Sequence, residues 1–504
     1  MKRINIIKSI LFAGTVVLGV SCTNLDEEVL DGVVIGGGAT APVNTASLLT
    51  KSYEGLRSFQ DIGGMYALDE MSTDALVGPT RGGDWDDNAK WRQLHTHTWA
   101  PDHNEVKGAW NSLLSNVYNC NLVVENGTAT EVTQARFLRA FYYYNVIDLF
   151  GQVPYREVGS SLEEDPKVWT RQEATAFVIS ELEAVVGSLP ARTAGDASIA
   201  NKDAAHFLLA KLYLNKGVFN AADPAGPYVF DAADMTKVVS HVDAISSSLA
   251  ADYWDNFKPN NNTSPEILFS SKNLRGGAGG GIQSRWRAGM HYNQTPDGWN
   301  GFATVAEYYN KFDPNDKRIK NADPAIIAAF GNPVGFQIGQ MYKPGGVTPL
   351  QDRNGNPLVY TAALTLITSG ATLETAGVRG QKYIPDAANL GTPENDYELM
   401  RYSDALLMKA EAIARGGAGS IGTIMTDIAV RTGKPASPAT LDGIYLERSK
   451  ELWWEGWRRN DMIRFGKFLA ARELKPYVSD NRYVLFPIPA DALFNANLKQ
   501  NPGY

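Results

Sequence analysis

The sequence predicts a mainly α-helical protein with one large insertion of loops and short strands. From residue 45 to about residue 250, apolar residues recur every three or four positions, which is the spacing of a buried helix face. The same spacing returns at Tyr402–Ala414 and Leu446–Phe468, within the C-terminal region 398–504. Between these regions, residues 251–397 are rich in Pro, Asn and Gly, so we expect loops and short strands there.

Two parts of the first helical region share a sequence pattern. Ala135–Asn145 and Ala205–Asn215 have Ala, Phe, Leu, Ala, Tyr and Asn at matching positions, 70 residues apart. That separation is about two repeats of roughly 34 residues, and the paired alanines recur in Ala405–Ala410. Small residues at fixed points of a helix let a second helix approach closely. The pattern therefore favours a superhelix of stacked, tetratricopeptide-like helix pairs, with a chance match as the alternative.

The N-terminus has the features of an export signal. Residues 1–21 contain three basic residues, no acidic residue, and the apolar run Ile10–Val20. Because this run is about half the ~20 residues that span a bilayer, it indicates a cleaved signal peptide. Cys22 stands where bacterial lipoproteins carry their lipid, so we expect lipidation there, followed by a polar linker to residue 44. An ordinary signal peptide with an incidental cysteine is the alternative.

The composition excludes several classes of protein. The chain has 504 residues, 44% of them apolar, which is too apolar for a disordered chain. Its formal net charge of −8 argues against nucleic-acid binding, which needs surplus Lys and Arg to neutralise phosphates. The second of the two cysteines, Cys120, lies in an apolar helical stretch, and we expect it to be buried with no redox role.

The first candidate binding segment is residues 74–99, in which aromatic and charged residues surround a pair of glycines. A Trp ring presents a flat apolar face that fits a sugar ring, and carboxylates or guanidinium groups beside it can hydrogen-bond to hydroxyls. We expect Trp85 to contact a ligand, with Asp74 in the same candidate site. Arg81 and Asp84 either contact the ligand as well or hold the loop in place.

The second candidate segment lies in the irregular insertion. Trp286, Tyr292 and Trp299 stand among Gly and Pro residues, where a large exposed aromatic side chain suggests a function. Arg379 follows a glycine turn and either contacts the ligand or pairs with an acid. In contrast, residues 453–459 (WWEGWRR) have the spacing of a buried helix face, which predicts core packing with buried ion pairs.

No segment matches a known catalytic or metal-binding motif. His95, His97 and His103 raise the possibility of zinc, but a catalytic zinc site needs three ligands in fixed geometry, and we expect no metal. Calcium at the acidic residues 84–87 stays possible, without an EF-hand pattern to support it. Since no nucleophile elbow, zinc-protease or phosphate-loop motif is found, we expect a binding protein without cofactors, not an enzyme.

Four motifs, in order along the chain, resemble those of the SusD/RagB family. They are FLRAFYYYNVIDLFGQVP at 137–154, RYSDALLMKAEA at 401–412, ERSKELWWEGWRRNDM at 447–462, and LFPIP at 485–489 with NPGY at 501–504. The resemblance implies a tetratricopeptide-like scaffold, lipid-anchored at the outer face of the outer membrane, that binds nutrient glycans or, in some members, peptides. It also implies a partner, a TonB-dependent transporter of the SusC type. A scaffold subunit that binds no ligand is a further alternative, and a glycoside hydrolase is the least expected.

Overall fold

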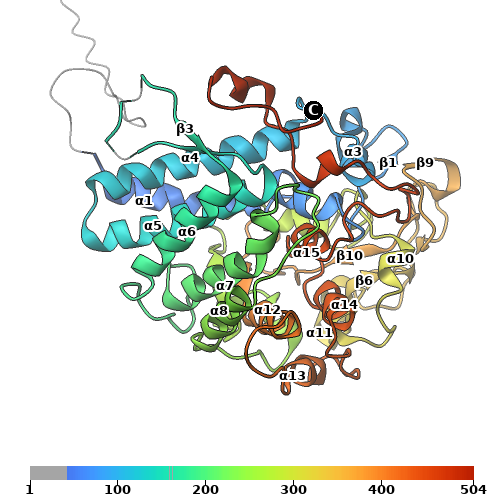
Figure 1. Ribbon diagram of the computed structural model, residues 1–504. Helices are drawn as coiled ribbons and strands as arrows, with labels where there is room; N and C mark the ends of the chain where they lie inside the picture. Colours follow the sequence, from blue (N-terminus) through green and yellow to red (C-terminus); the bar gives the residue numbers. More distant parts are fainter. Residues whose placement is uncertain (1–42, 158, 162, 278) are drawn as a thin grey trace, which may run out of the picture. The chain divides into compact units, whose positions relative to one another are not determined.

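Helices that pack side by side build the N-terminal part of the protein (Figure 1). The computed structural model describes residues 43–157, 159–161, 163–277 and 279–504, and residues 44–504 form one compact unit. The predicted signal peptide, the Cys22 lipidation site and nearly all of the linker lie outside the described residues. The long helices are α1 (Thr45–Glu54), α4 (Asn104–Asn126), α5 (Ala129–Leu149), α6 (Arg171–Val185), α7 (Lys202–Phe219) and α8 (Ala232–Asp243). From α4 to α8, each helix packs against the next.

Short sequence signals determine where two of these helices begin. At the start of α5, the Thr128 hydroxyl accepts a hydrogen bond from the Glu131 amide, and the Glu131 carboxylate accepts one from the Thr128 amide. Thr170 and Glu173 make the same reciprocal pair at the start of α6. Each pair satisfies amide groups that have no partner within the helix, so the helix starts at a defined residue.

The shared sequence pattern falls on helices in the interior of the stack. Ala135 and Ala140 on α5, and Ala205 and Ala210 on α7, are each at most 1% exposed. The third occurrence of the alanine pair lies on α12 (Tyr402–Ala414), which packs against both α7 and α8. The mainly α-helical, tetratricopeptide-like fold class predicted from the sequence is confirmed.

The region 251–397 contains only short elements. Among its described residues the longest helix is α11, with seven residues. Its helices are α9 (Ser284–Arg287), α10 (Ala306–Tyr309) and α11 (Pro324–Phe330), and its strands are β4 (Ile267–Ser271), β5 (Lys320–Asn321), β6 (Val334–Gln337), β7 (Gly339–Gln340), β8 (Val359–Tyr360), β9 (Ile367–Thr368) and β10 (Arg379–Gln381). The loops and short strands expected here are therefore found.

Small sheets connect this region to the rest of the chain. Strand β9 pairs in parallel with β1 (Thr80–Arg81), and β4 pairs antiparallel with β11 (Tyr397–Arg401). Strands β10, β6 and β5 form a three-stranded sheet, while β7 pairs with β8 and β2 (Val153–Tyr155) with β3 (Lys167–Trp169). The β1–β9 pair joins the first candidate binding segment to the irregular insertion that contains the second.

One predicted helix is divided in two. The prediction of a single helix over Leu446–Phe468 is wrong, because α14 (Leu441–Glu451) and α15 (Arg458–Arg464) are separate helices. Between them, Trp454 and Gly456 have φ angles of 60° and 82°, which a right-handed helix does not accommodate. The helix at Tyr402–Ala414, in contrast, has the predicted bounds.

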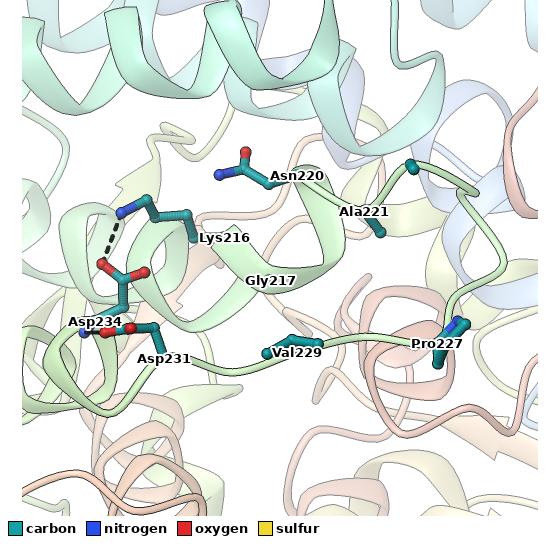
Figure 2. Close-up of a pocket in the computed structure, with 9 residues that line it drawn as sticks. Lys216, Gly217, Asn220, Ala221, Pro227, Val229, Asp231 and Asp234 are labelled. Carbon is teal, nitrogen blue, oxygen red and sulfur yellow. Dashed lines mark hydrogen bonds and ion pairs between the residues drawn. The ribbon is translucent and has the colours of Figure 1, made fainter.

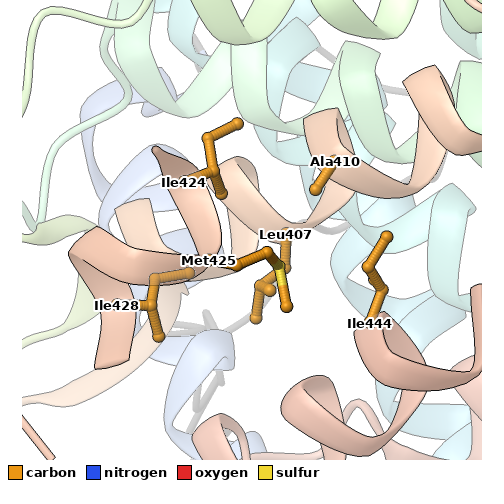
Figure 3. Packing of buried hydrophobic residues seen from close by; sticks show 6 residues of the cluster. All are labelled: Leu407, Ala410, Ile424, Met425, Ile428 and Ile444. Atoms are coloured by element: carbon orange, nitrogen blue, oxygen red, sulfur yellow. The ribbon is translucent and has the colours of Figure 1, made fainter. Parts of the chain in front are cut away.

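Helix α12 is the centre of an apolar cluster in the C-terminal region (Figure 3). Its Leu407 and Ala410 pack against Ile444 of α14 and against α13 (Ile424–Val430), and each of these buried side chains is at most 8% exposed. The remaining α-helices among the described residues are the short α2 (Gly64–Tyr66) and α3 (Lys90–Thr96). Among the described residues, no helix combines the length and the apolar composition needed to cross a membrane.

Buried ion pairs connect distant parts of the chain. Arg458 makes two hydrogen bonds to the Asp74 carboxylate, of 2.7 and 2.8 Å, and Arg459 pairs with Asp148 at 3.0 Å. Arg401 contacts Glu455 at 2.7 Å and also pairs with Glu451 and Glu266. Trp453 and Trp454 are at most 3% exposed. The predicted core with buried ion pairs at residues 453–459 is confirmed for these side chains.

Candidate functional site

The structure brings together the two aromatic segments that the sequence separates by about 200 residues. The indole nitrogen of Trp85 donates a hydrogen bond of 2.9 Å to the Trp299 carbonyl oxygen. The Tyr292 hydroxyl donates one of 3.1 Å to a carboxylate oxygen of Asp84. Trp299 is 37% exposed, and Trp85 and Tyr292 are half-buried. We call the side chains of Asp84, Trp85, Tyr292, Trp299 and Arg353 the aromatic surface.

The backbone presents Trp85 in an uncommon conformation. A tight turn follows β1, in which the amide and carbonyl of Arg81 pair with those of Asp84, and Trp85 then has a φ of 62°. A bulky residue at positive φ is strained and persists only where its surroundings fix it. Here the Trp85 ring packs 4.8 Å from the Phe302 ring, and a Cβ at Gly301 would lie 2.4 Å from the indole. Only glycine at position 301 leaves room for this ring.

Arg353 completes the aromatic surface, although the sequence did not predict it. Its guanidinium carbon lies 4.3 Å from the centre of the Tyr292 ring, a favourable cation–π contact. The buried Glu374 carboxylate fixes Arg353 by binding both its side chain and its amide. The same carboxylate contacts the ring of buried His291 at 2.7 Å. Nothing in the sequence distinguished Arg353 from the Asn-Gly turn beside it.

The pKa shifts agree with this hydrogen-bonded arrangement. Burial acts to raise the pKa of Glu374, but hydrogen bonds from Arg353 and His291 hold it below its usual value, so the carboxylate is charged. Burial lowers the pKa of His291. Burial, together with the nearby Asp84 carboxylate, raises the pKa of Tyr292, so its hydroxyl keeps its proton and acts as a donor to Asp84.

Arg81 and Arg379 lie beneath the aromatic surface and not on it. Arg81 is 2% exposed and donates hydrogen bonds of 2.8 to 3.2 Å to the carbonyl oxygens of Gly301, Leu373 and Ala376. Arg379 is 1% exposed and donates to the carbonyl oxygen of Glu374. Burial lowers the pKa of both guanidinium groups. For Arg81 the structure fits the alternative that it holds the loops in place, and the contact of either side chain with a ligand is not supported.

Two more of the predicted site residues are interior side chains. Asp74 is bound by Arg458 and by Lys311, and these charges hold its pKa well below the usual value although burial opposes them. Trp286, on α9, is fully buried. Because the protein encloses both side chains, neither can contact a ligand at the aromatic surface.

The three neighbouring histidines are bonded to backbone carbonyl oxygens. One ring nitrogen of each lies 2.8 to 3.0 Å from the carbonyl of Glu473, Ser72 or Lys90, for His95, His97 and His103 respectively. Within the described part of the chain, no group of three His, Cys, Asp or Glu side chains is arranged to hold a metal ion. These histidines therefore have a structural explanation for their positions.

A cavity of about 590 Å³ lies elsewhere, between the end of α7 and the start of α8 (Figure 2). Lys216 and Asp234 form an ion pair of 2.7 Å across it, and none of its described lining residues is aromatic. It thus offers no flat apolar ring for a sugar. The aromatic surface presents such rings beside a carboxylate and a guanidinium, so it is the candidate site.

Comparisons with known proteins agree on one family. Residues 242–478 match a model of the SusD family, and residues 39–214 match a SusD-like model described as starch-binding and associating with the outer membrane. The starch-binding protein SusD of Bacteroides thetaiotaomicron is 26% identical over 472 residues, covering 83% of this chain and 82% of that protein. SusD-like protein P25 of Formosa agariphila is 24% identical over 412 residues, covering 72% and 71% of the two chains.

Solved structures show the same fold. A laminarin-binding SusD-like protein matches with a TM-score of 0.69 at 20% identity, covering 91% of this chain and 99% of that one. Surface glycan-binding protein A from Bacteroides thetaiotaomicron, solved with laminarihexaose, matches with a TM-score of 0.65 at 20% identity, covering 91% and 98%. Because family models match on both sides of residues 215–241 and the relatives align over most of their length, the chain belongs to the SusD family.

Proposed function

We propose that this protein is a glycan-binding lipoprotein of the cell surface and that the aromatic surface holds the glycan. The observation that carries the proposal is the meeting of Trp85, Tyr292 and Trp299 from two distant loops. Rings of this kind stack on the apolar faces of sugars. The Asp84 carboxylate and the Arg353 guanidinium beside them can hydrogen-bond to sugar hydroxyls.

The relatives support binding and not catalysis. Starch-binding SusD and the laminarin-binding SusD-like protein are described as binding proteins, and we infer the same role for this chain. On this proposal the protein releases its glycan unchanged. Chromatography of laminarin or starch after incubation with the protein tests this directly, since shorter products that disappear on mutation of one acidic residue would indicate a hydrolase.

The proposal includes an anchor and a partner. Cys22 would carry the lipid, and a SusC-like TonB-dependent transporter would receive the glycan. A single acyl chain binds membranes only marginally, whereas the diacylglyceryl group of a bacterial lipoprotein has two chains and would anchor the protein stably. The SusD-like family that matches residues 39–214 associates with the outer membrane, which supports a location of this protein at that membrane. Co-purification with a TonB-dependent transporter from native membranes tests the pairing, and recovery as a monomer only, with uptake unaffected by deletion, would contradict it.

Binding to immobilised laminarin or starch, compared among variants, tests the site itself. We expect Trp299→Ala to weaken binding by about 1–3 kcal/mol, or roughly 5- to 150-fold in Kd, as for loss of a well-packed aromatic contact. Phe494→Ala is the control, because Phe494 is an aromatic side chain 90% exposed on another part of the chain. If Trp299→Ala weakens binding no more than Phe494→Ala does, the assignment of the site is contradicted.

A further inference from the structure

Three guanidinium groups at or near the aromatic surface are exposed or partly exposed, and each has a carboxylate partner. Arg353 is bound by Glu374. Two neighbours are paired in the same way, Arg287 with Asp297 at 2.8 Å and Arg92 with Asp86 at 3.0 Å. The N–H groups that these carboxylates leave free can still donate hydrogen bonds, but the positive charge that an anionic ligand would meet is already balanced by a carboxylate.

The two guanidinium groups without a carboxylate partner are out of reach. Arg81 and Arg379 are at most 2% exposed, and both donate hydrogen bonds to backbone carbonyl oxygens. Their positive charge lies below the surface and offsets part of the field of the acids, but it gives a bound ligand no donor to contact. Lys90, which lies over the Trp91 ring, is paired with Glu105 at 2.9 Å. Among these described residues, a polyanion therefore finds no accessible cation that lacks a carboxylate partner.

Two exposed carboxylates, one in the aromatic surface and one beside it, lack a cation partner. Asp84 accepts its hydrogen bond from Tyr292, and Asp87 accepts one of 2.6 Å from the indole of Trp91. Both acids are exposed, and neither lies within 4.0 Å of a basic nitrogen in the described chain. Arg353 acts on Asp84 only over a longer distance. Carboxylates in this state accept hydrogen bonds from neutral sugar hydroxyls and repel a uronate or sulfate group.

We propose that the aromatic surface selects neutral glycans and rejects polyanionic ones, an inference that rests on the proposed glycan-binding function. Selection comes from Asp84 in the aromatic surface and from Asp87 beside it, because the guanidinium groups around them are either paired or buried. In water, two like charges at about 6 Å from one ligand carboxylate together weaken binding about tenfold. The effect decreases as added salt screens the exposed charges.

A matched pair of ligands tests this selection. Binding of laminarin, a neutral glucan, is compared with binding of carboxymethylated laminarin by calorimetry at low and at high ionic strength. We expect the carboxymethylated chain to bind about tenfold more weakly at low salt, with a smaller difference at high salt. The same pair is made from starch, so that the result does not depend on one glucan.

The double variant Asp84→Asn, Asp87→Asn identifies the residues responsible. Each Asn keeps an oxygen that can accept the hydrogen bond from Tyr292 or Trp91 but carries no charge, so the fold of the loop is retained. We expect this variant to bind the carboxymethylated chain about tenfold more tightly than the wild type does. Glu125→Gln with Asp442→Asn, two exposed acids on α4 and α14, removes the same charge elsewhere and should change nothing.

The outcomes separate this inference from the function on which it rests. Equal or tighter binding of the carboxymethylated chain by the wild type would overturn the selection and leave glycan binding intact. If the ratio of the two Kd values, for carboxymethylated and for neutral laminarin, is the same in the double variant as in the wild type, the assignment to Asp84 and Asp87 is overturned. If neither the neutral nor the charged chains bind, the proposed function fails together with the inference.

Discussion

Trp286 and Trp299 are 13 residues apart in the same irregular segment, and the structure gives them opposite roles. Trp286 is fully buried, so Trp286→Ala should lower the free energy of unfolding by about 3–5 kcal/mol, as for other buried aromatic residues. For a unit of this length the entropy of unfolding is about 1 kcal/mol/K, so the Tm should fall by roughly 3–5 °C. Trp299 is 37% exposed, and Trp299→Ala should change the Tm by less than about 1 °C.

Calorimetry of both variants, with a laminarin titration of each, checks this division. Trp299→Ala keeps the backbone carbonyl that accepts the Trp85 hydrogen bond, so a loss of binding would report the missing ring and not a collapsed loop. Trp286→Ala should bind normally at temperatures where it remains folded. The reasoning is refuted if Trp299→Ala lowers the Tm as much as Trp286→Ala does, or if Trp286→Ala loses binding with its Tm unchanged.

Three further predictions concern stability and location. Burial raises the pKa of Glu70 from 4.5 to about 8. Between these pH values the folded protein keeps a proton on Glu70 that the unfolded chain releases, so the stability that this proton contributes is lost as the pH rises. Glu70→Gln should therefore become more stable relative to the wild type as the pH rises from about 5 to about 8, by at most about 5 kcal/mol. Urea titrations at several pH values measure this difference. Parallel plots of unfolding free energy against pH for the two proteins would disprove it. Arg401→Met removes the buried partner of Glu451 and Glu455 and should cost about 3–5 kcal/mol in the same assay, whereas a change below about 1 kcal/mol would show that the pairs are dispensable. Cys22→Ala should release the protein from membranes, and unchanged membrane fractionation would exclude the lipid anchor.

The sequence predicted the types of residue in the site better than their positions. Trp85, Tyr292 and Trp299 were all predicted, because large aromatic residues among Gly and Pro have few structural explanations. Their contact was not predictable, since the Trp85 indole binds a backbone carbonyl and any residue at position 299 supplies one. Arg353 was missed because its place depends on the buried Glu374, which lies 21 residues away in a segment without periodicity.

Burial separated the predicted residues that reach the surface from those that the interior encloses. Trp286 lies on α9, a helix of four residues that is too short to show a periodic pattern. The burial of the Trp286 side chain could therefore not be predicted from the sequence. Asp74 pairs with Arg458, which is 384 residues away. Similarly, the apolar spacing continues from α14 through Trp454 to α15, although Trp454 has a left-handed backbone conformation, and Gly456 is the one sequence signal of a break between the two helices.

The pairing of Asp74 with Arg458 and of Asp148 with Arg459 bears on how this protein can be divided experimentally. Family models match the two halves separately, which suggests two fragments that could be expressed alone. An N-terminal fragment ending near residue 250 would keep both carboxylates and lose both guanidinium groups. Asp74 would then be a buried charge with neither Arg458 nor Lys311 beside it, and Asp148 would keep only Arg171, at 4.0 Å. The halves should therefore be insoluble or unfolded when made singly and should recover a native fold only when produced together, as complementing pieces of one cooperative unit.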